Sequence, residues 1–214
     1  MGIYDRDYVR EEFAPGPNFG PGRSMVITII VINAAVFLAN LFFGGKDNVI
    51  MNFLAADVYS LIRPWLWWQL LTCGFAHDPE DIGHILFNML GLFFLGREVE
   101  RVLGRWEFLR FYLLAVVAGS VVHLARIYFL APETTDVLVG DTLVPYSPWT
   151  QGLWGASAGV TGVVMLFILY FPHRKLRLLL LPIEFPAWVL GTVFILIDVL
   201  GYGGIFLPIY GPQA

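Results

Sequence analysis

Five long apolar segments separated by polar connections dominate the pattern of this chain. They cover residues 25–43, 81–103, 106–130 and 154–171, and a fifth starts near residue 185. A membrane-spanning helix needs about 20 predominantly apolar residues, so each segment is a candidate span. Polar groups interrupt the second and third segments, whereas the first and fourth carry no formal charge. The pattern predicts an all-α, polytopic membrane bundle with five visible spans.

The connections between these segments differ in character. Residues 1–24 are polar and of mixed charge, which predicts a short N-terminal tail, and residues 201–214 are rich in Gly and Pro, which predicts a loop. Residues 44–80 form a long first loop that contains Trp65-Leu66-Trp67-Trp68. This cluster is too short to span a bilayer, and tryptophan favours the headgroup level. We therefore expect an interfacial, partly helical loop.

The basic residues predict an orientation. Three Lys or Arg residues precede the first span, four lie between the second and third, and three follow the fourth, which makes ten of the 13 in the chain. Such residues concentrate on the cytoplasmic side of membrane proteins. We expect a cytoplasmic N-terminus, a location in the cell (inner) membrane, and a fourth span that runs inward from the outer face.

Composition excludes several classes of protein. The chain is 57% hydrophobic and 14% charged, against about half apolar and a quarter charged in soluble domains. The net charge is −4, and no basic cluster with interleaved aromatic residues indicates nucleic-acid binding. The single cysteine, Cys73, excludes an internal disulfide framework and a cysteine-based metal cluster.

Candidate chemistry begins with Gly155-Ala156-Ser157-Ala158-Gly159, at the start of the fourth apolar segment. In soluble hydrolases a G-x-S-x-G motif requires a strand, a sharp turn and a helix in an α/β sheet, which this context does not offer. Two interpretations stay open. Small residues four apart, Gly155/Gly159 and Ala158/Gly162, let two helices approach closely. Alternatively, Ser157 is a nucleophile within the membrane.

A second constellation is His84-Ile85-Leu86-Phe87-Asn88, followed by Gly91. His84, Asn88 and Gly91 are spaced four and three apart, so they share one helical stripe. Polar groups inside a bundle are costly, and they tend to be functional or bonded to each other. The stripe is either a helix-to-helix hydrogen bond or a pair of donors aimed at a developing oxyanion.

Three ordered motifs together resemble the rhomboid family of intramembrane serine proteases. They are Gly74-Phe75-Ala76-His77 with Gly83-His84-Ile85-Leu86-Phe87-Asn88-Met89, then Gly96-Arg97-Glu98-Val99-Glu100 with Leu103-Gly104, then Gly155-Ala156-Ser157. The resemblance implies that Ser157 is the catalytic nucleophile and that His84 and Asn88 stabilise the oxyanion. It implies a bundle of six spans, of which five are visible, over residues 25–214. It also implies a structural role for the Gly-Arg-Glu-Val-Glu stretch, and neither a metal nor a cofactor.

The chain departs from the family pattern in three places. Ala158 stands where the family usually has a second glycine, and the spacing from His77 to His84 is long, so no role is assigned to His77. The family's general base is a histidine on a sixth span, whereas no histidine follows His173 here. We expect the chain to be incomplete at its C-terminus, with the base outside these residues. His123 is a weak alternative, better explained as a core histidine.

We consider three functions, of which the first two follow from the resemblance to the rhomboid family. The first is a serine endopeptidase that cleaves transmembrane protein substrates near the outer membrane face. The second is a catalytically inactive rhomboid-like protein that binds membrane helices. The third is a small transporter or channel, suggested by intramembrane His84, His123 and Asp198 but ranked last because repeat symmetry is missing. The expected partners are substrates and the lipid bilayer, and nothing in the sequence indicates an oligomeric state.

Overall fold

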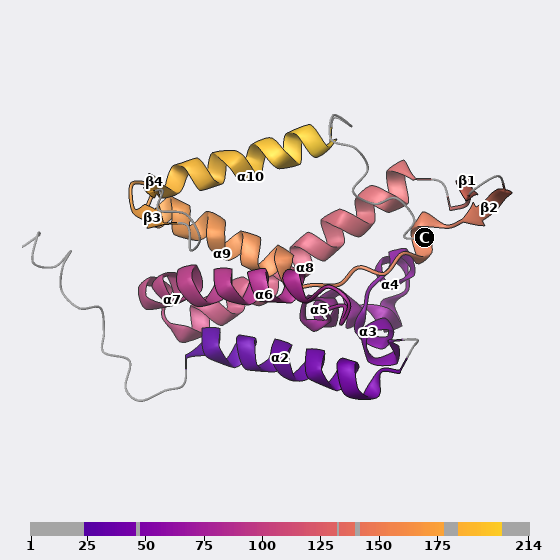
Figure 1. Cartoon of the computed structure of the whole chain (residues 1–214), viewed down its shortest axis with the longest axis horizontal. Coiled ribbons are helices and arrows are strands. Elements are labelled where there is room, and N and C mark those ends of the chain that lie inside the picture. The colour runs from indigo at the N-terminus through magenta and orange to yellow at the C-terminus, as the bar shows by residue number, and fades with distance from the viewer. Residues whose placement is uncertain (1–23, 46–47, 132, 140–141, 178–183, 203–214) are drawn as a thin grey trace, which may run out of the picture.

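The computed structural model describes residues 24–45, 48–131, 133–139, 142–177 and 184–202, so the N-terminal tail and the last loop lie outside the described residues. Helices make up most of it. The main ones are α2 (Met25–Phe43), α6 (Ile82–Gly91), α7 (Arg97–Leu103), α8 (Arg105–Leu130), α9 (Ser157–Tyr170) and α10 (Ala187–Tyr202). Helix α8 runs diagonally to α2 and α9 (Figure 1). A short π-helical segment, Leu92–Gly96, joins α6 to α7.

Three of the predicted spans are confirmed as helices long and apolar enough to cross a membrane. Among the described residues these are Met25–Phe43, Ile82–Leu103 and Arg105–Leu130. The fourth candidate, α9, has 14 residues, and α10 has 16. Both are shorter than the usual 20, so the count of five spans stays a prediction.

The long first loop is partly helical, as the sequence predicts. It contains α3 (Val49–Leu54), α4 (Val58–Ile62) and α5 (Gln69–Thr72), with 3-10 turns at Pro64–Leu66 and Cys73–Phe75. Trp65 and Trp67 are 71% and 57% exposed, a degree of exposure that suits contact with lipid headgroups.

Two short hairpins correct the all-α prediction. Strand β1 (Thr135–Val139) pairs antiparallel with β2 (Thr142–Tyr146), and β3 (Lys175–Arg177) pairs antiparallel with β4 (Glu184–Pro186). The two hairpins lie at opposite ends of the bundle (Figure 1). The sequence Thr-Asp-Val-Leu-Val of β1 is rich in β-branched residues, which favour strands, but it falls in a connection that was expected to be a loop.

The Gly-Arg-Glu-Val-Glu stretch, residues 96–100, makes contacts that join several elements of the bundle. The Glu100 carboxylate accepts hydrogen bonds from Ser24 Oγ (2.5 Å) and from the backbone N–H of Met25 (2.6 Å), at the start of α2. Glu98 pairs with Arg101 at 2.7 Å and with Arg174 at 3.5 Å, beyond the end of α9. These contacts join α2, α7 and the end of α9 at one face of the bundle, away from Ser157.

Candidate functional site

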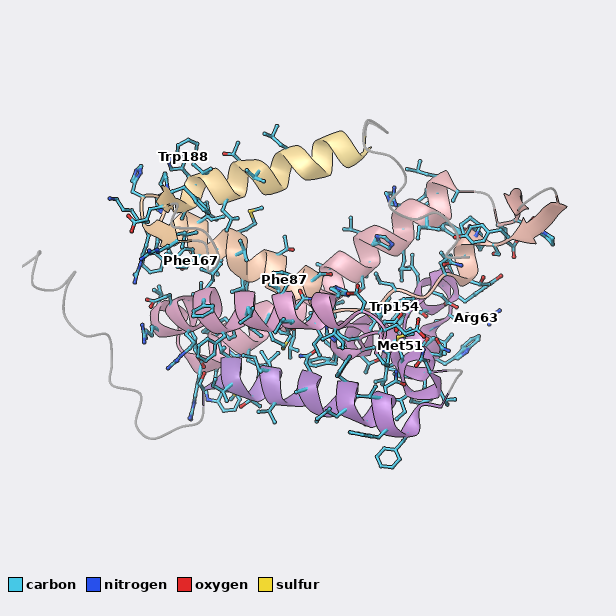
Figure 2. All side chains as sticks on the ribbon, in the orientation of Figure 1. Met51, Arg63, Phe87, Trp154, Phe167 and Trp188 are labelled. Atoms are coloured by element: carbon cyan, nitrogen blue, oxygen red, sulfur yellow. The ribbon has the colours of Figure 1, made fainter. Side chains whose placement is uncertain are left out.

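Helix α9 begins at Ser157, three residues later than the predicted span of 154–171. The preceding residues are extended and bonded to the first loop instead. Leu153 and Ala56 exchange backbone hydrogen bonds of 2.6 and 3.0 Å, and the Gly155 N–H donates to the Cys73 carbonyl at 2.9 Å. In Figure 2, Trp154 and Met51 are labelled on the right-hand side of the molecule, and Phe167 and Trp188 on the left-hand side. The first loop therefore fixes the position from which the serine helix starts.

Gly155 turns the chain from this extended segment into α9. Its φ is +113°, a conformation that residues with a side chain rarely adopt. A Cβ here would lie 2.6 Å from His84 Cε1 and 2.9 Å from His84 Nε2. Gly155 therefore precedes the helix and faces an imidazole, and the prediction that it forms a helix-packing pair with Gly159 is wrong.

The Ser157 side chain is exposed, although Ala156 and Gly159 beside it are buried. The first N–H groups of an α-helix have no acceptor within the helix, so the Ser157 N–H is directed away from the helix body. The helix dipole also places partial positive charge at this end. An accessible hydroxyl with a nearby backbone donor is the arrangement that nucleophilic attack on a carbonyl needs.

The predicted stripe on α6 runs alongside the start of α9. His84 lies against Gly155, and a Cβ on Gly91 would lie 3.3 Å from Val160 Cγ1. Asn88 comes one turn after His84 and one turn before Gly91, so it belongs to the stretch of α6 that faces the first turn of α9. The start of α6 is capped by Asp81, whose carboxylate accepts the His84 N–H at 3.0 Å.

Asn88 carries an unused donor. Its side chain is 7% exposed, and its Nδ2 is buried with no hydrogen-bond partner in the part of the chain that the structure describes. An unsatisfied buried donor lowers the stability of the folded protein by about 1–3 kcal/mol. A catalytic role is one explanation for such a group in a native structure. The helix-to-helix hydrogen bond that the sequence allowed for Asn88 is therefore not formed through this nitrogen among the described residues.

His77, to which the sequence analysis assigned no role, lies in the site. Its side chain is 1% exposed, and its Nε2 accepts the backbone N–H of Ala156 at 3.3 Å. Its ring meets the His84 ring edge to face, with centroids 5.3 Å apart. Burial, reinforced by neighbouring His84, lowers the pKa of His77 to about 4. The motif Gly74-Phe75-Ala76-His77 already pointed to this histidine. No role was assigned to it because its spacing to His84 is longer than the resemblance leads one to expect.

The small residues within α9 pack against α8. A Cβ on Gly159 would lie 2.6 Å from the Tyr112 ring, and one on Gly162 would lie 2.9 Å from Ala115 Cβ. On the α8 side, a Cβ on Gly119 would lie 2.6 Å from Ala158 Cβ. Close helix packing is thus confirmed for the residues after Ser157, and it coexists with an exposed serine.

The other candidate residues lie outside this cluster. His123 is exposed on α8, so the expectation of a core histidine is wrong, and His173 is exposed beyond the end of α9. The side chain of Asp198 lies outside the described residues. Within the described residues, no group of three or more His, Cys, Asp or Glu side chains is placed to hold a metal ion.

Comparisons with known proteins identify the family to which this chain is similar. The family model for the rhomboid domain matches residues 64–207. The mitochondrial RHOMBOID-like protein 12 of Arabidopsis thaliana is 31% identical over 182 residues, which cover 83% of this chain and 50% of the relative. Rhomboid protease AarA of Providencia stuartii is 24% identical over 152 residues, which cover 69% of this chain and 50% of the relative.

Rhomboid protein 1 of Saccharomyces cerevisiae mitochondria is 26% identical over 168 residues, which cover 78% of this chain and 42% of the relative. The chain thus spans about half the length of these curated relatives or less. No solved structure matches it. Because the rhomboid domain covers well over half of the sequence, this chain belongs to the rhomboid family.

Proposed function

We propose that this protein is an intramembrane serine endopeptidase that cleaves transmembrane substrates near the outer membrane face, with Ser157 as its nucleophile. The observation that carries the proposal is the position of Ser157. It is exposed at the first residue of α9, just after a glycine turn against which His84 packs. Membership of a family that includes proteases supports the same assignment.

The proposed reaction is acyl transfer to the serine followed by hydrolysis. Ser157 Oγ forms a bond to the scissile carbonyl carbon, and the carbonyl oxygen becomes an oxyanion. Collapse of this tetrahedral intermediate breaks the C–N bond, and the leaving nitrogen takes a proton. Water then releases the acyl group from Ser157. A general base takes the Ser157 Oγ proton as the new bond forms and delivers it to the leaving nitrogen.

The oxyanion is proposed to bind three donors: the Ser157 N–H, His84 and the Nδ2 group of Asn88. The Asn88 Nδ2 group has no partner in the described structure, so its donation to the oxyanion breaks no existing hydrogen bond. Removing one such donor typically costs about 3 kcal/mol of transition-state stabilisation.

The remaining assignments rest on the same proposal. Transmembrane protein segments are the substrates and the lipid bilayer is the medium. The N-terminus faces the cytoplasm, and Ser157 opens toward the outer face of the cell (inner) membrane. This orientation follows from the distribution of Lys and Arg between the connections.

The alternative is a catalytically inactive rhomboid-like protein that binds membrane helices. It is favoured by one sequence feature, the lack of a histidine after His173 within these 214 residues. A serine without a base stays protonated and is a weak nucleophile.

Labelling with a serine-directed fluorescent phosphonate, in the full-length protein in detergent, separates the two. The endopeptidase should label, and Ser157→Ala should remove the label. Ser147→Ala is the matched control, because Ser147 lies in the connection before α9 and its hydroxyl donates to the Glu133 carbonyl there in an exposed hydrogen bond. Labelling that persists in Ser157→Ala contradicts the nucleophile, and absence of labelling in the wild type favours the inactive protein.

A further inference from the structure

We propose that His77 is a positioning residue that joins the two halves of the site, accepting the Ala156 N–H at the start of α9 while its ring supports the His84 imidazole. The inference rests on the proposed role of Ser157. His77 comes from the first loop and reaches both α6 and α9. The hydrogen bond to Ala156 is 3.3 Å long, and the ring centroids of His77 and His84 are 5.3 Å apart.

The protonation state of His77 follows from this contact. A neutral imidazole has one donor and one acceptor nitrogen, so Nε2, which accepts from Ala156, leaves the proton on Nδ1. Nδ1 is buried and has no partner in the part of the chain that the structure describes. Leaving a buried donor unpaired is destabilising. The Nε2 acceptor satisfies the buried Ala156 N–H, which an apolar side chain of similar size would leave unpaired.

The bond acts directly on the backbone that carries the nucleophile. Ala156 is the residue before Ser157, and it has no side-chain cap to hold the helix start. Fixing its N–H fixes the peptide plane between Gly155 and Ala156, and with it the direction in which α9 begins. The Gly155 N–H donates to the Cys73 carbonyl and so restrains the preceding peptide plane, between Trp154 and Gly155.

The ring contact acts on the other half of the site. His84 is half-buried and lies between the His77 ring and the Gly155 backbone. Removal of the His77 ring would open space behind His84 and let its imidazole move. A misplacement of about 1 Å at a reacting group can cost about 100-fold in rate, so His77 should affect the chemical step without touching the substrate.

The test compares three substitutions of His77 in the full chain. Gln reaches as far as Nε2 and keeps an acceptor, Asn reaches only as far as Nδ1, and Leu keeps none. The matched control is Asn40→Leu. Asn40, on α2, is also buried, and its Oδ1 accepts the N–H of Met51 from the first loop at 3.1 Å. Each variant is measured for phosphonate labelling kinetics, for its thermal midpoint, and for hydrogen–deuterium exchange of the peptide around Ala156.

We expect His77→Leu and His77→Asn to lower the maximal labelling rate by ~10- to 100-fold with little change in probe affinity. Exchange at Ala156 should accelerate in both. His77→Gln should restore the rate to within about threefold of wild type, and Asn40→Leu should lower the midpoint while leaving the rate and the Ala156 exchange near wild type.

The inference is overturned if His77→Leu labels at the wild-type rate. It is also overturned if His77→Gln is as slow as His77→Leu. The same holds if the folded fraction of His77→Leu labels at the wild-type rate, as we expect for Asn40→Leu. If His77→Leu does not fold, the comparison of His77→Asn with His77→Gln replaces it: equal labelling rates in these two variants overturn the inference. Wild-type protein that does not label contradicts the proposed function itself, and that outcome differs from every one above.

Discussion

The two ends of the motif Gly155-Ala156-Ser157-Ala158-Gly159 serve opposite purposes. Gly155 lies outside the helix at a positive φ and faces the His84 imidazole. Gly159 lies inside the helix and packs directly on the Tyr112 ring. One small-residue pattern thus makes a polar, strained turn and an apolar, close-packed interface within four residues. A nucleophile inside a bilayer needs both, because the packed side fixes the helix and the turn side leaves space around the hydroxyl.

The largest effect that distinguishes these two sides should come from Gly155→Ala. The new Cβ would clash with His84 and strain a backbone at φ +113°, so we expect phosphonate labelling to fall by at least ~100-fold. Gly45→Ala is the matched control, because Gly45 also has a positive φ (+65°) but has nothing within 4 Å of the added Cβ. If Gly155→Ala labels as fast as Gly45→Ala and the wild type, neither the backbone at Gly155 nor its contact with His84 shapes the site.

Asn88→Ala should come next. We expect labelling or turnover to fall about 100-fold, the usual effect of losing one oxyanion donor, with little change in the thermal midpoint because Nδ2 bonds nothing in the described structure. Asn40→Ala should do the reverse, because Asn40 bonds the Met51 N–H. An equal loss of folding and activity in Asn88→Ala would favour a packing role for that residue.

Gly159→Ala tests the packed side of the motif. Its Cβ would lie 2.6 Å from Tyr112, and overpacking of this kind costs ~1–3 kcal/mol. We expect the thermal midpoint in detergent to fall by several degrees, with the labelling rate of the folded fraction within about threefold of wild type. A large loss of rate at an unchanged midpoint would show that the packed side also shapes the site.

The smallest effect should come from pH. The folded pKa of His77 is about 4, below the ordinary 6.5, so the folded state binds fewer protons between these values. Stability from this group is fully present above pH 6.5 and is lost as the pH falls toward 4. Lowering the pH from 7 to 5.5 should cost about 1 kcal/mol.

His77→Gln should remove most of this pH dependence, as followed by thermal unfolding in detergent. Burial lowers the pKa of His77 most; His84 lowers it further, whereas the Phe75 backbone and Asp81 raise it. His84→Gln and Asp81→Asn therefore serve as controls that should shift the pH window without abolishing it. A midpoint that falls equally in wild type and His77→Gln would assign the pH dependence to other groups.

Several features could be predicted from the sequence because they depend on local patterns. Apolar length alone placed the three helical stretches that are long enough to span, and the Trp-rich loop was correctly expected to be partly helical. The spacing of His84, Asn88 and Gly91 placed them on one stripe, and the structure sets the ends of that stripe against α9. The hairpin at residues 135–146 was missed because β-branched residues in a polar connection give only a weak signal.

What the sequence determined is the set of chemical groups: a serine among small residues, a helical stripe with His84 and Asn88, and apolar segments long enough to cross a bilayer. Tertiary structure alone decided which of these groups meet. The helix starts at Ser157 because the first loop, 80 to 100 residues earlier in the chain, holds Leu153, Gly155 and Ala156 through backbone and imidazole hydrogen bonds. Hydropathy is additive along the chain and can be read locally, whereas hydrogen bonds between distant segments depend on the packing of the whole bundle. For that reason His77 became visible as part of the site only in the folded molecule.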